Sequence, residues 1–384
     1  MTSPSPIPTA AGAWSADVGG VRVHFGSGAL ELLGSRVREQ GGSRVLLVTD
    51  PGVRAAGYAG RALAALEREG LVAAVFDGVG ENPTALQVEE GRRCAASFGP
   101  DLLVGLGGGS AMDCAKGINF LLTNGGRMED YWGSGKASRP MLPSIGVPTT
   151  AGTGSEAQSY ALISHPETHQ KMACGDRKAR FREVILDPRL VASAPRTVAA
   201  TAGIDAVSHA VESHVTARSN TVSRMLSREA WRLLSGSLEE LFASPGNLQA
   251  AGDALLGAHL AGAAIEASML GAAHACANPL TARFGIAHGA AVGLMLPHVV
   301  RFNGETAPSG ELYGNLLAGG PLPLARRIED LRAAAGLPAR LRDCGVDAGS
   351  LPDLAGEAAR QWTASFNPRP VDAAALRSLY EAAF

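Results

Sequence analysis

Short apolar runs alternate with helix-patterned stretches through the first half of the chain. The runs Arg44–Thr49 and Asp101–Leu106 show no alternation of polar and apolar residues, so each strand is expected to be buried on both faces. The stretches Ala29–Gln40, Arg54–Gly70 and Thr84–Phe98 have helical spacing. This order predicts a doubly wound α/β fold, with a mostly parallel, Rossmann-like sheet covered by helices on both faces.

The pattern changes near residue 195. From Val198 onward the segments have helical spacing and almost no β-branched runs, which predicts an all-helical second half. A chain of 384 residues is long enough for two domains. We place the boundary within residues 188–197, giving an α/β domain at 1–195 and a helical domain at 196–384.

Composition and charge exclude several classes of protein. A net charge of −2 gives no electrostatic reason to expect nucleic acid or an anionic membrane as a partner. The N-terminal tail MTSPSPIPTAAGAW lacks the basic start and apolar core of a signal peptide, and no apolar run is long enough to span a membrane. The five cysteines form no CxxC pair, so neither a disulfide framework nor a thiolate zinc site is indicated. We expect a cytoplasmic, soluble protein.

A glycine turn follows the second buried run directly and opens a helix. Its members are Gly107, Gly108, Gly109 and Ser110. Backbone N–H groups point outward at such a turn, and glycine lets a pyrophosphate approach them closely. Asp50 follows the other buried run, where a carboxylate can bond the adenosine ribose and favour NAD(H) over NADP(H). An ordinary turn aspartate before Pro51 explains Asp50 equally well.

One carboxylate and several histidines have the spacing of a metal site. Asp205 and His209 lie four residues apart in a helical segment, so their side chains share one face. Two further histidines, His274 and His288, lie in a region rich in glycine and alanine. Three imidazoles and one carboxylate suit a divalent transition metal such as Fe²⁺ or, alternatively, Zn²⁺. His214 falls outside this register and is expected at the surface.

Four motifs in order span nearly the whole chain. They are GGGSAMDCAK (107–116), PTTAGTGSE (148–156), GIDAVSHAVE (203–212) and HGAAVGLMLPHVVRFN (288–303), with NPRPVD (367–372) near the end. Together they resemble the iron-containing, group III alcohol dehydrogenase family. The resemblance implies an NAD(P)-dependent alcohol dehydrogenase or aldehyde reductase for a small molecule. It also implies a dinucleotide-binding first domain and a metal-binding helical second domain, and we expect a homodimer.

The resemblance also implies roles for individual residues. It assigns the metal to Asp205, His209, His274 and His288. It assigns the pyrophosphate to Gly107, Gly108, Gly109, Ser110 and Asp113. The nicotinamide half would be lined by Thr149, Thr150 and Thr153, with Lys171 near its ribose. A short loop at Asn82 and Pro83 would face the cofactor.

One position departs from the family pattern. Many members carry a histidine four residues after the third ligand, where it serves proton transfer, but this chain has Asn278. Asparagine cannot relay a proton, yet it can hydrogen-bond a polar or anionic substrate. Gln158, Lys171 and Asn278 are therefore the candidate catalytic residues.

The substrate is the least constrained feature of the sequence. Five cations lie within 171–182, and such a run is either a solvated face or a receptor for an acidic group. Phosphonoacetaldehyde reductases are similar in this region, which favours a small aldehyde bearing a phosphonate or carboxylate. The alternatives are a non-redox synthase or lyase of the dehydroquinate-synthase-like superfamily and a maleylacetate-reductase-like enzyme. That reductase branch replaces the ligand aspartate, whereas Asp205 is present here.

Overall fold

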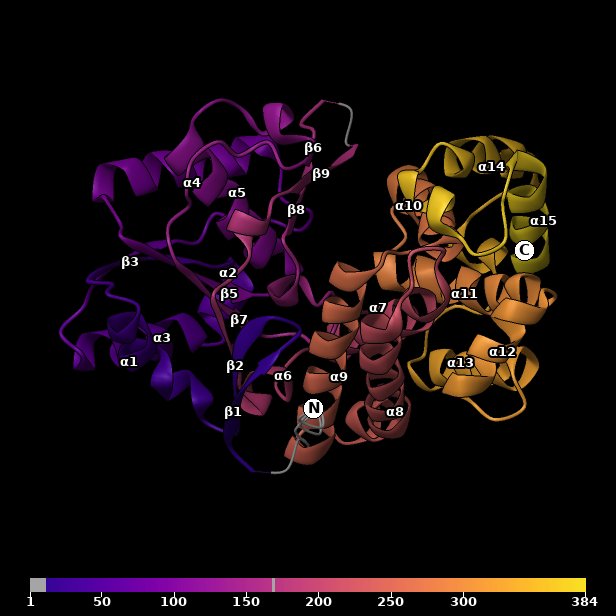
Figure 1. Cartoon of the computed structure of the whole chain (residues 1–384), viewed down its shortest axis with the longest axis horizontal. Coiled ribbons are helices and arrows are strands. Elements are labelled where there is room, and N and C mark those ends of the chain that lie inside the picture. The colour runs from indigo at the N-terminus through magenta and orange to yellow at the C-terminus, as the bar shows by residue number, and fades with distance from the viewer. Residues whose placement is uncertain (1–11, 168–169) are drawn as a thin grey trace. The chain divides into compact units, whose positions relative to one another are not determined.

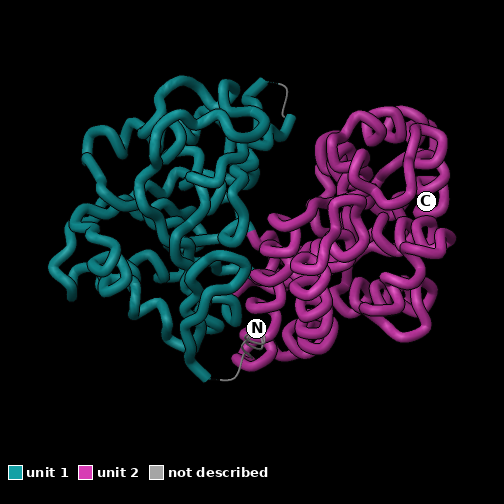
Figure 2. Tube along the Cα trace, in the orientation of Figure 1, with its two compact units in different colours: residues 1–150, 155–193 teal, residues 151–154, 194–384 magenta. Residues whose placement is uncertain are grey.

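The computed structural model describes residues 12–167 and 170–384 (Figure 1), so residues 1–11 of the predicted N-terminal tail lie outside the described residues. The chain forms two units, shown in different colours in Figure 2. Unit 1 comprises residues 1–150 and 155–193, and unit 2 comprises residues 151–154 and 194–384. The grouping of residues 151–154 with the helical unit was not predicted from the sequence.

Unit 1 is built on a seven-stranded sheet in the order β1-β2-β10-β7-β5-β3-β4. The strands are β1 (Trp14–Val18), β2 (Val21–Phe25), β3 (Arg44–Val48), β4 (Val72–Phe76), β5 (Leu102–Gly107), β7 (Ser144–Pro148) and β10 (Glu183–Leu186). All neighbouring pairs are parallel except β1 with β2. The predicted fold class, a mostly parallel α/β sheet followed by a helical half, is confirmed.

Helices cover both faces of this sheet, as the apolar runs require. α1 (Leu33–Glu39) and α3 (Tyr58–Arg68) lie on one side of the strands, and α4 (Ala85–Phe98) and α5 (Gly109–Asn124) lie on the other (Figure 1). Central residues of β3 and β5 have no exposed surface. Burial of every side chain in a strand is possible only when both faces are covered, which explains the absence of polar alternation.

Two of the predicted helices are interrupted. The stretch expected as one helix over 54–70 is divided into α2 (Pro51–Ala55) and α3, because Gly57 between them has φ of +83°. The stretch 29–40 begins as a 3₁₀ turn, η1 (Ala29–Leu32), before α1. Unit 1 also contains a small sheet that the sequence did not reveal, in the order β6-β9-β8 (Gly133–Ser134, Lys171–Gly175, Tyr160–Ser164).

The regular elements of unit 2 are all helices among its described residues, as predicted. Its main helices are α7 (Arg196–Val215), α8 (Thr221–Ala243), α9 (Leu248–Ala267), α10 (Ala272–Phe284), α11 (His288–Gly304), α12 (Ala307–Leu316), α13 (Pro321–Ala334), α14 (Leu351–Ala359) and α15 (Ala373–Ala383). α7, α8 and α9 pack against one another. α7 is buried on every side along most of its length, which makes it a suitable support for side chains that must be held in place.

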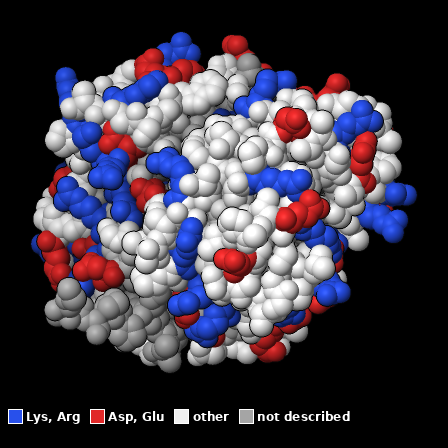
Figure 3. All heavy atoms as spheres, turned by 45° about the vertical axis from the view of Figure 1, so that its right-hand side comes forward, with Lys and Arg blue, Asp and Glu red and all other residues white. Residues whose placement is uncertain are grey.

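Two observations bear on partners. No single helix among the described residues has both the length and the hydropathy of a membrane span, and only α9 and α10 taken together reach them, with a bend of 107° between the two. On the face drawn in Figure 3, Lys and Arg side chains are interspersed with Asp and Glu side chains. This mixing agrees with the small net charge of −2.

Candidate functional site

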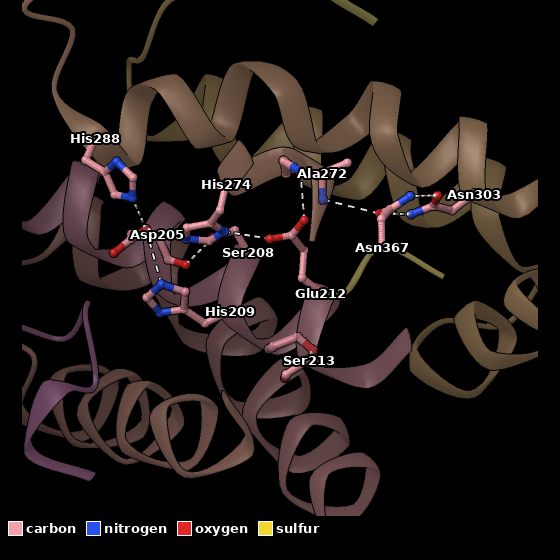
Figure 4. A network of polar contacts seen from close by, with 12 residues as sticks. Asp205, Ser208, His209, Glu212, Ser213, Ala272, His274, His288, Asn303 and Asn367 are labelled. Carbon is pink, nitrogen blue, oxygen red and sulfur yellow. Dashed lines mark hydrogen bonds and ion pairs between the residues drawn. The ribbon is translucent and has the colours of Figure 1, made fainter. Parts of the chain in front are cut away.

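Four side chains from three helices of unit 2 point at one place (Figure 4). α7 supplies Asp205 and His209, one helical turn apart, while His274 lies on α10 and His288 begins α11. The Oδ1 atom of Asp205 lies 3.4 Å from Nε2 of His209, 3.7 Å from Nε2 of His274 and 3.9 Å from Nε2 of His288. Ligand atoms of the first three residues lie within 4.8 Å of one another.

The donor atoms fit a divalent metal. Oδ1 of Asp205 and Nε2 of His274 are buried atoms with no hydrogen-bond partner among the described residues. Buried polar atoms without partners are costly, and a bound cation is a common reason for them. Imidazole nitrogens with one carboxylate oxygen, and no thiolate, are the ligand set of Fe²⁺ and Zn²⁺ centres.

The charges at this centre agree with metal binding. Burial raises the pKa of Asp205, but the facing imidazoles outweigh it and hold the pKa below the usual range of a carboxyl. Burial lowers the pKa of His209. Burial also acts to lower the pKa of His274, but the facing carboxylates of Asp205 and Glu212 raise it to about 9. His274 Nε2 would lose that proton if it held a metal cation, as imidazole ligands generally do.

Glu212 is a functional residue that the sequence reasoning did not single out. Its Oε2 atom lies 2.5 Å from Nδ1 of His274, and its Oε1 atom accepts a hydrogen bond of 2.8 Å from the backbone N–H of Ala273. A carboxylate on the far nitrogen of an imidazole fixes the tautomer and leaves Nε2 as the ligand atom. Its spacing could have identified it, because Glu212 lies seven residues, or two helical turns, after Asp205 and therefore on the same face of α7.

The prediction that His214 lies at the surface is wrong. Its side chain is buried, and Nδ1 lies 2.8 Å from the Ser227 hydroxyl. Every residue of α7 from Gly203 to Val215 is buried, so this part of the helix has no solvent face to which a polar residue could be assigned. Burial lowers the pKa of His214 to about 4.

The predicted cofactor residues of unit 1 gather at one edge of the sheet. Asp50, Asn82 and Thr149 follow β3, β4 and β7, Gly107 is the last residue of β5, and these four strands are parallel. Their carboxyl ends therefore meet at the same edge. The chain leaves β3 toward β4 on one side and leaves β5 toward β7 on the other. Ligands of doubly wound sheets bind at such a switch point.

The glycine turn and Asp50 are neighbours at this switch point. Gly107 has φ of +152°, and a Cβ atom there would lie 2.7 Å from Ala111 Cβ and 3.0 Å from Asp50 Oδ2. α5 begins at Gly109, and Gly108 at its N-cap has no side chain to occupy the free backbone N–H groups. Asp50 caps α2, because its Oδ1 atom accepts a hydrogen bond of 2.9 Å from Val53 N. Its second oxygen faces the turn.

Asp113 belongs to a buried network. Its Oδ1 atom accepts a hydrogen bond of 2.5 Å from the Ser155 hydroxyl and lies 3.7 Å from the ammonium of Lys116. Lys116 in turn donates to the Ser155 carbonyl at 2.7 Å and to the Tyr160 carbonyl at 2.7 Å. Burial raises the pKa of Asp113, and the charges of Lys116 and Lys171 oppose that rise. The network ties α5 to the segment that contains Gln158.

The remaining predicted residues are distributed over both units. Ser110 lies in the first turn of α5, and the Thr150 hydroxyl lies 3.6 Å from the point where a Cβ of Gly108 would be. Asn82 has φ of +51°, the only positive value among the described non-glycine residues. Thr153 falls in the stretch 151–154 that belongs to unit 2. Asn278 lies one turn after His274 on α10, where its Nδ2 atom donates to Gln361 Oε1 at 3.0 Å.

Comparison with known proteins identifies the family. The model described as iron-containing alcohol dehydrogenase matches residues 20–188, and the model of the C-terminal part of the Fe-containing alcohol dehydrogenase family matches residues 199–384. A 1,3-propanediol dehydrogenase of Klebsiella pneumoniae is 33% identical over 372 residues, which cover 94% of this chain and 96% of the relative.

Two solved structures extend the comparison. The crystal structure of a 1,3-propanediol oxidoreductase matches with a TM-score of 0.89 and 32% identity, over 97% of this chain and 99% of the other. A sulfoacetaldehyde reductase of Bifidobacterium kashiwanohense, in complex with NAD⁺, matches with a TM-score of 0.87 and 26% identity, over 94% and 96%. The chain therefore belongs to the iron-containing alcohol dehydrogenase family, whose members are metal-dependent, NAD-linked oxidoreductases acting on CH–OH groups.

Proposed function

We propose that this enzyme reduces a short aldehyde that carries a polar substituent, using NADH in preference to NADPH and a metal held by Asp205, His209, His274 and His288. The observation that carries the proposal is the convergence of three imidazole nitrogens on the Asp205 carboxylate. We expect Fe²⁺, with Zn²⁺ as the alternative, since both accept this ligand set.

The metal and the protein have different tasks in this reaction. A bound divalent cation supplies Lewis-acid stabilisation of the negative charge that develops on the carbonyl oxygen during hydride transfer. The buried helices α7 and α10 hold the ligands in place, and Glu212 fixes the His274 ring through its Nδ1 atom, on the side away from the metal site. A rigid site of this kind needs little reorganisation when charge develops on the substrate.

The preference for NADH rests on Asp50 and the glycine turn. A pyrophosphate at the N-terminus of α5 would accept hydrogen bonds from the backbone N–H groups, which no side chain caps because the N-cap residue is Gly108. The Asp50 oxygen that faces Gly107 then lies where a 2′-phosphate would meet a negative charge. The solved sulfoacetaldehyde reductase, which contains NAD⁺, supports the same cofactor for this chain.

The polar substituent is proposed from the amide pair of Asn278 and Gln361. Amides can donate to an anion or accept from a hydroxyl, and the pair lies one turn after the ligand His274. The named relatives act on both kinds of molecule, a propanediol and sulfoacetaldehyde. They include no phosphonoacetaldehyde reductase, so the expected likeness to that branch is not supported.

The cationic run 171–182 fits a surface face better than a substrate receptor. The ammonium of Lys178 donates to the Ala137 carbonyl at 2.9 Å, and Arg180 donates to the Gly19 carbonyl. Arg177 and Arg182 are exposed. Lys171, whose charge acts on Asp113, stays in the proposal as the group near the nicotinamide ribose, and Gln158 stays a candidate catalytic residue.

The test is NADH oxidation, followed by absorbance, with aldehydes of equal length that carry a sulfonate, a phosphonate, a carboxylate, a hydroxyl or no substituent. Metal-loaded enzyme is expected to favour a substituted aldehyde, and chelation is expected to abolish turnover until Fe²⁺ or Zn²⁺ is returned. Equal kcat/KM across the panel would refute the proposed recognition of a polar substituent. Full activity in metal-free protein would refute the proposed dependence on a metal. Homodimer formation and a cytoplasmic location stay predictions.

A further inference from the structure

The N-terminus of α10 is capped by side chains from distant parts of the chain (Figure 4). Gly271 at the N-cap has no side chain of its own to accept the first backbone N–H groups. Asn367 Oδ1 accepts the N–H of Ala272 at 3.2 Å, and Glu212 Oε1 accepts the N–H of Ala273 at 2.8 Å. The ligand His274 is the next residue, so it lies in the first turn that these two side chains hold.

The Asn367 amide is itself held in one orientation. It is paired with the Asn303 amide, with Nδ2 of Asn367 lying 2.7 Å from Oδ1 of Asn303 and Nδ2 of Asn303 lying 3.1 Å from Oδ1 of Asn367. Nδ2 of Asn367 also donates to the Arg369 carbonyl at 2.7 Å, and Asn303 donates to the Tyr313 hydroxyl at 3.3 Å. With its two N–H groups donated, Asn367 presents its oxygen to Ala272.

This capped terminus is buried and closely packed. Asn367 is 6% exposed and Asn303 1% exposed. A Cβ atom on Gly271 would lie 3.0 Å from Asn367 Oδ1 and 3.1 Å from Glu212 Oε1. Asn367 and Glu212 are therefore packed closely against the first turn of α10, which carries His274.

We propose that Asn367 and Asn303 are positioning residues of the metal site, acting through the first turn of α10 on His274. The inference rests on the proposed metal function. Partners one step removed from a metal ligand commonly change metal affinity when mutated, even though they never touch the ion. The NPRPVD motif near the end of the chain then has a role in the site despite lying 93 residues after His274 in sequence.

The decisive measurement is metal affinity, because a merely structural role would lower stability and leave affinity unchanged. We expect Asn367→Ala to weaken Zn²⁺ binding by about 10- to 100-fold. Asn303→Ala keeps the Asn367 oxygen but removes one of the partners that orient the amide, together with the hydrogen bond to Tyr313, so it is expected to weaken binding less. At saturating metal, kcat of both variants is expected to return close to that of the wild type.

Asn247→Ala is the matched control. Asn247 caps α9 as Asn367 caps α10, accepting the N–H groups of Gln249 at 3.0 Å and Ala250 at 3.1 Å, but α9 carries no metal ligand. Each full-length, metal-loaded variant is titrated with a chelator to obtain the Zn²⁺ dissociation constant, and the melting temperature of each metal-free form is recorded. We expect Asn247→Ala to lower the melting temperature while its Zn²⁺ affinity equals that of the wild type.

The outcomes separate this inference from the function on which it rests. If the wild type binds no Zn²⁺ or Fe²⁺, the proposed metal function fails. If the wild type binds metal and both Asn367→Ala and Asn303→Ala bind it as tightly as Asn247→Ala does, the positioning role is wrong. Should Asn367→Ala not fold, Asn303→Ala alone decides, since it keeps the oxygen that caps α10.

Discussion

The proposed metal site in unit 2 and the proposed cofactor site in unit 1 use different parts of the polypeptide, side chains in one and backbone in the other. In unit 2 the metal centre consists of side chains on buried helices, with three imidazole nitrogens facing one carboxylate. In unit 1 the proposed pyrophosphate site consists of backbone, at the turn between β5 and α5 where Gly108 leaves N–H groups open. The first depends on which side chains are present, and the second depends on where side chains are absent.

This difference explains how each region responds to change. A side-chain site fails when one donor atom is removed, while its helices keep their packing. A backbone site tolerates many changes nearby but fails when an added Cβ atom forces the turn to shift, as it would at Gly107. One substitution in each region should therefore abolish one kind of binding and leave the other intact.

The largest effect is expected for His274→Ala in unit 2. Loss of one ligand should remove the metal and lower kcat/KM by at least about a thousandfold, because Lewis-acid stabilisation contributes several kcal/mol. NADH binding, followed by fluorescence, should stay within about twofold of wild type, since the glycine turn lies in unit 1. Loss of NADH affinity in a folded, metal-free variant would contradict the separation of the two sites.

Gly107→Ala is the reciprocal change in unit 1. The added methyl would lie 2.7 Å from Ala111 Cβ at a φ of +152°, so the turn must shift. We expect NADH affinity to fall by about a hundredfold, equivalent to nearly 3 kcal/mol, with metal content unchanged. Gly99→Ala is the control, because Gly99 also has a positive φ, +68°, but its Cβ would meet nothing within 4 Å. An equal loss in both variants would indicate backbone strain alone.

The same difference decides what could be predicted from sequence. The i, i+4 spacing of Asp205 and His209 placed two donors on one helix face, and the structure brings His274 and His288 to them. The proximity of Asp50 to Gly107 could not be read from sequence, because it depends on which strands are neighbours in the sheet. The burial of His214 was missed because a helix buried on all sides shows no amphipathic pattern.

The burial of His214 on α7 makes the stability of the protein depend on pH. Because the pKa of His214 is lowered to about 4 in the fold, the unfolded chain takes up a proton below about pH 6.5 that the folded protein does not accept until about pH 4. Stability is therefore lost as the pH falls through this window, by up to about 3 kcal/mol.

His214→Asn should remove this part of the acid sensitivity, measured by urea denaturation between pH 7 and pH 4 in metal-free protein. Ser227→Ala is the control, because it removes the hydrogen-bond partner at 2.8 Å and leaves the imidazole. That control should lower the free energy of unfolding at every pH and leave its slope against pH unchanged. If the slope is unchanged in His214→Asn, another group causes the loss of stability at acid pH.

The smallest effect concerns the Asp50 carboxylate, for which the sequence allowed two interpretations: the structure shows the capping role, and the role in cofactor choice stays a proposal. Asp50 Oδ1 caps α2 through Val53 N, and Oδ2 faces the glycine turn. Asp50→Asn separates the two roles, because asparagine caps a helix as well as aspartate does but carries no charge. If the charge repels a 2′-phosphate by about 1 kcal/mol, the ratio of kcat/KM for NADH over NADPH should fall about fivefold, while the melting temperature stays constant. Asp50→Gly loses the cap as well, so it should show the same change in the ratio together with a lower melting temperature. An unchanged ratio in Asp50→Asn would leave Asp50 with the capping role alone, and cofactor choice would then depend on other residues at the carboxyl edge of the sheet.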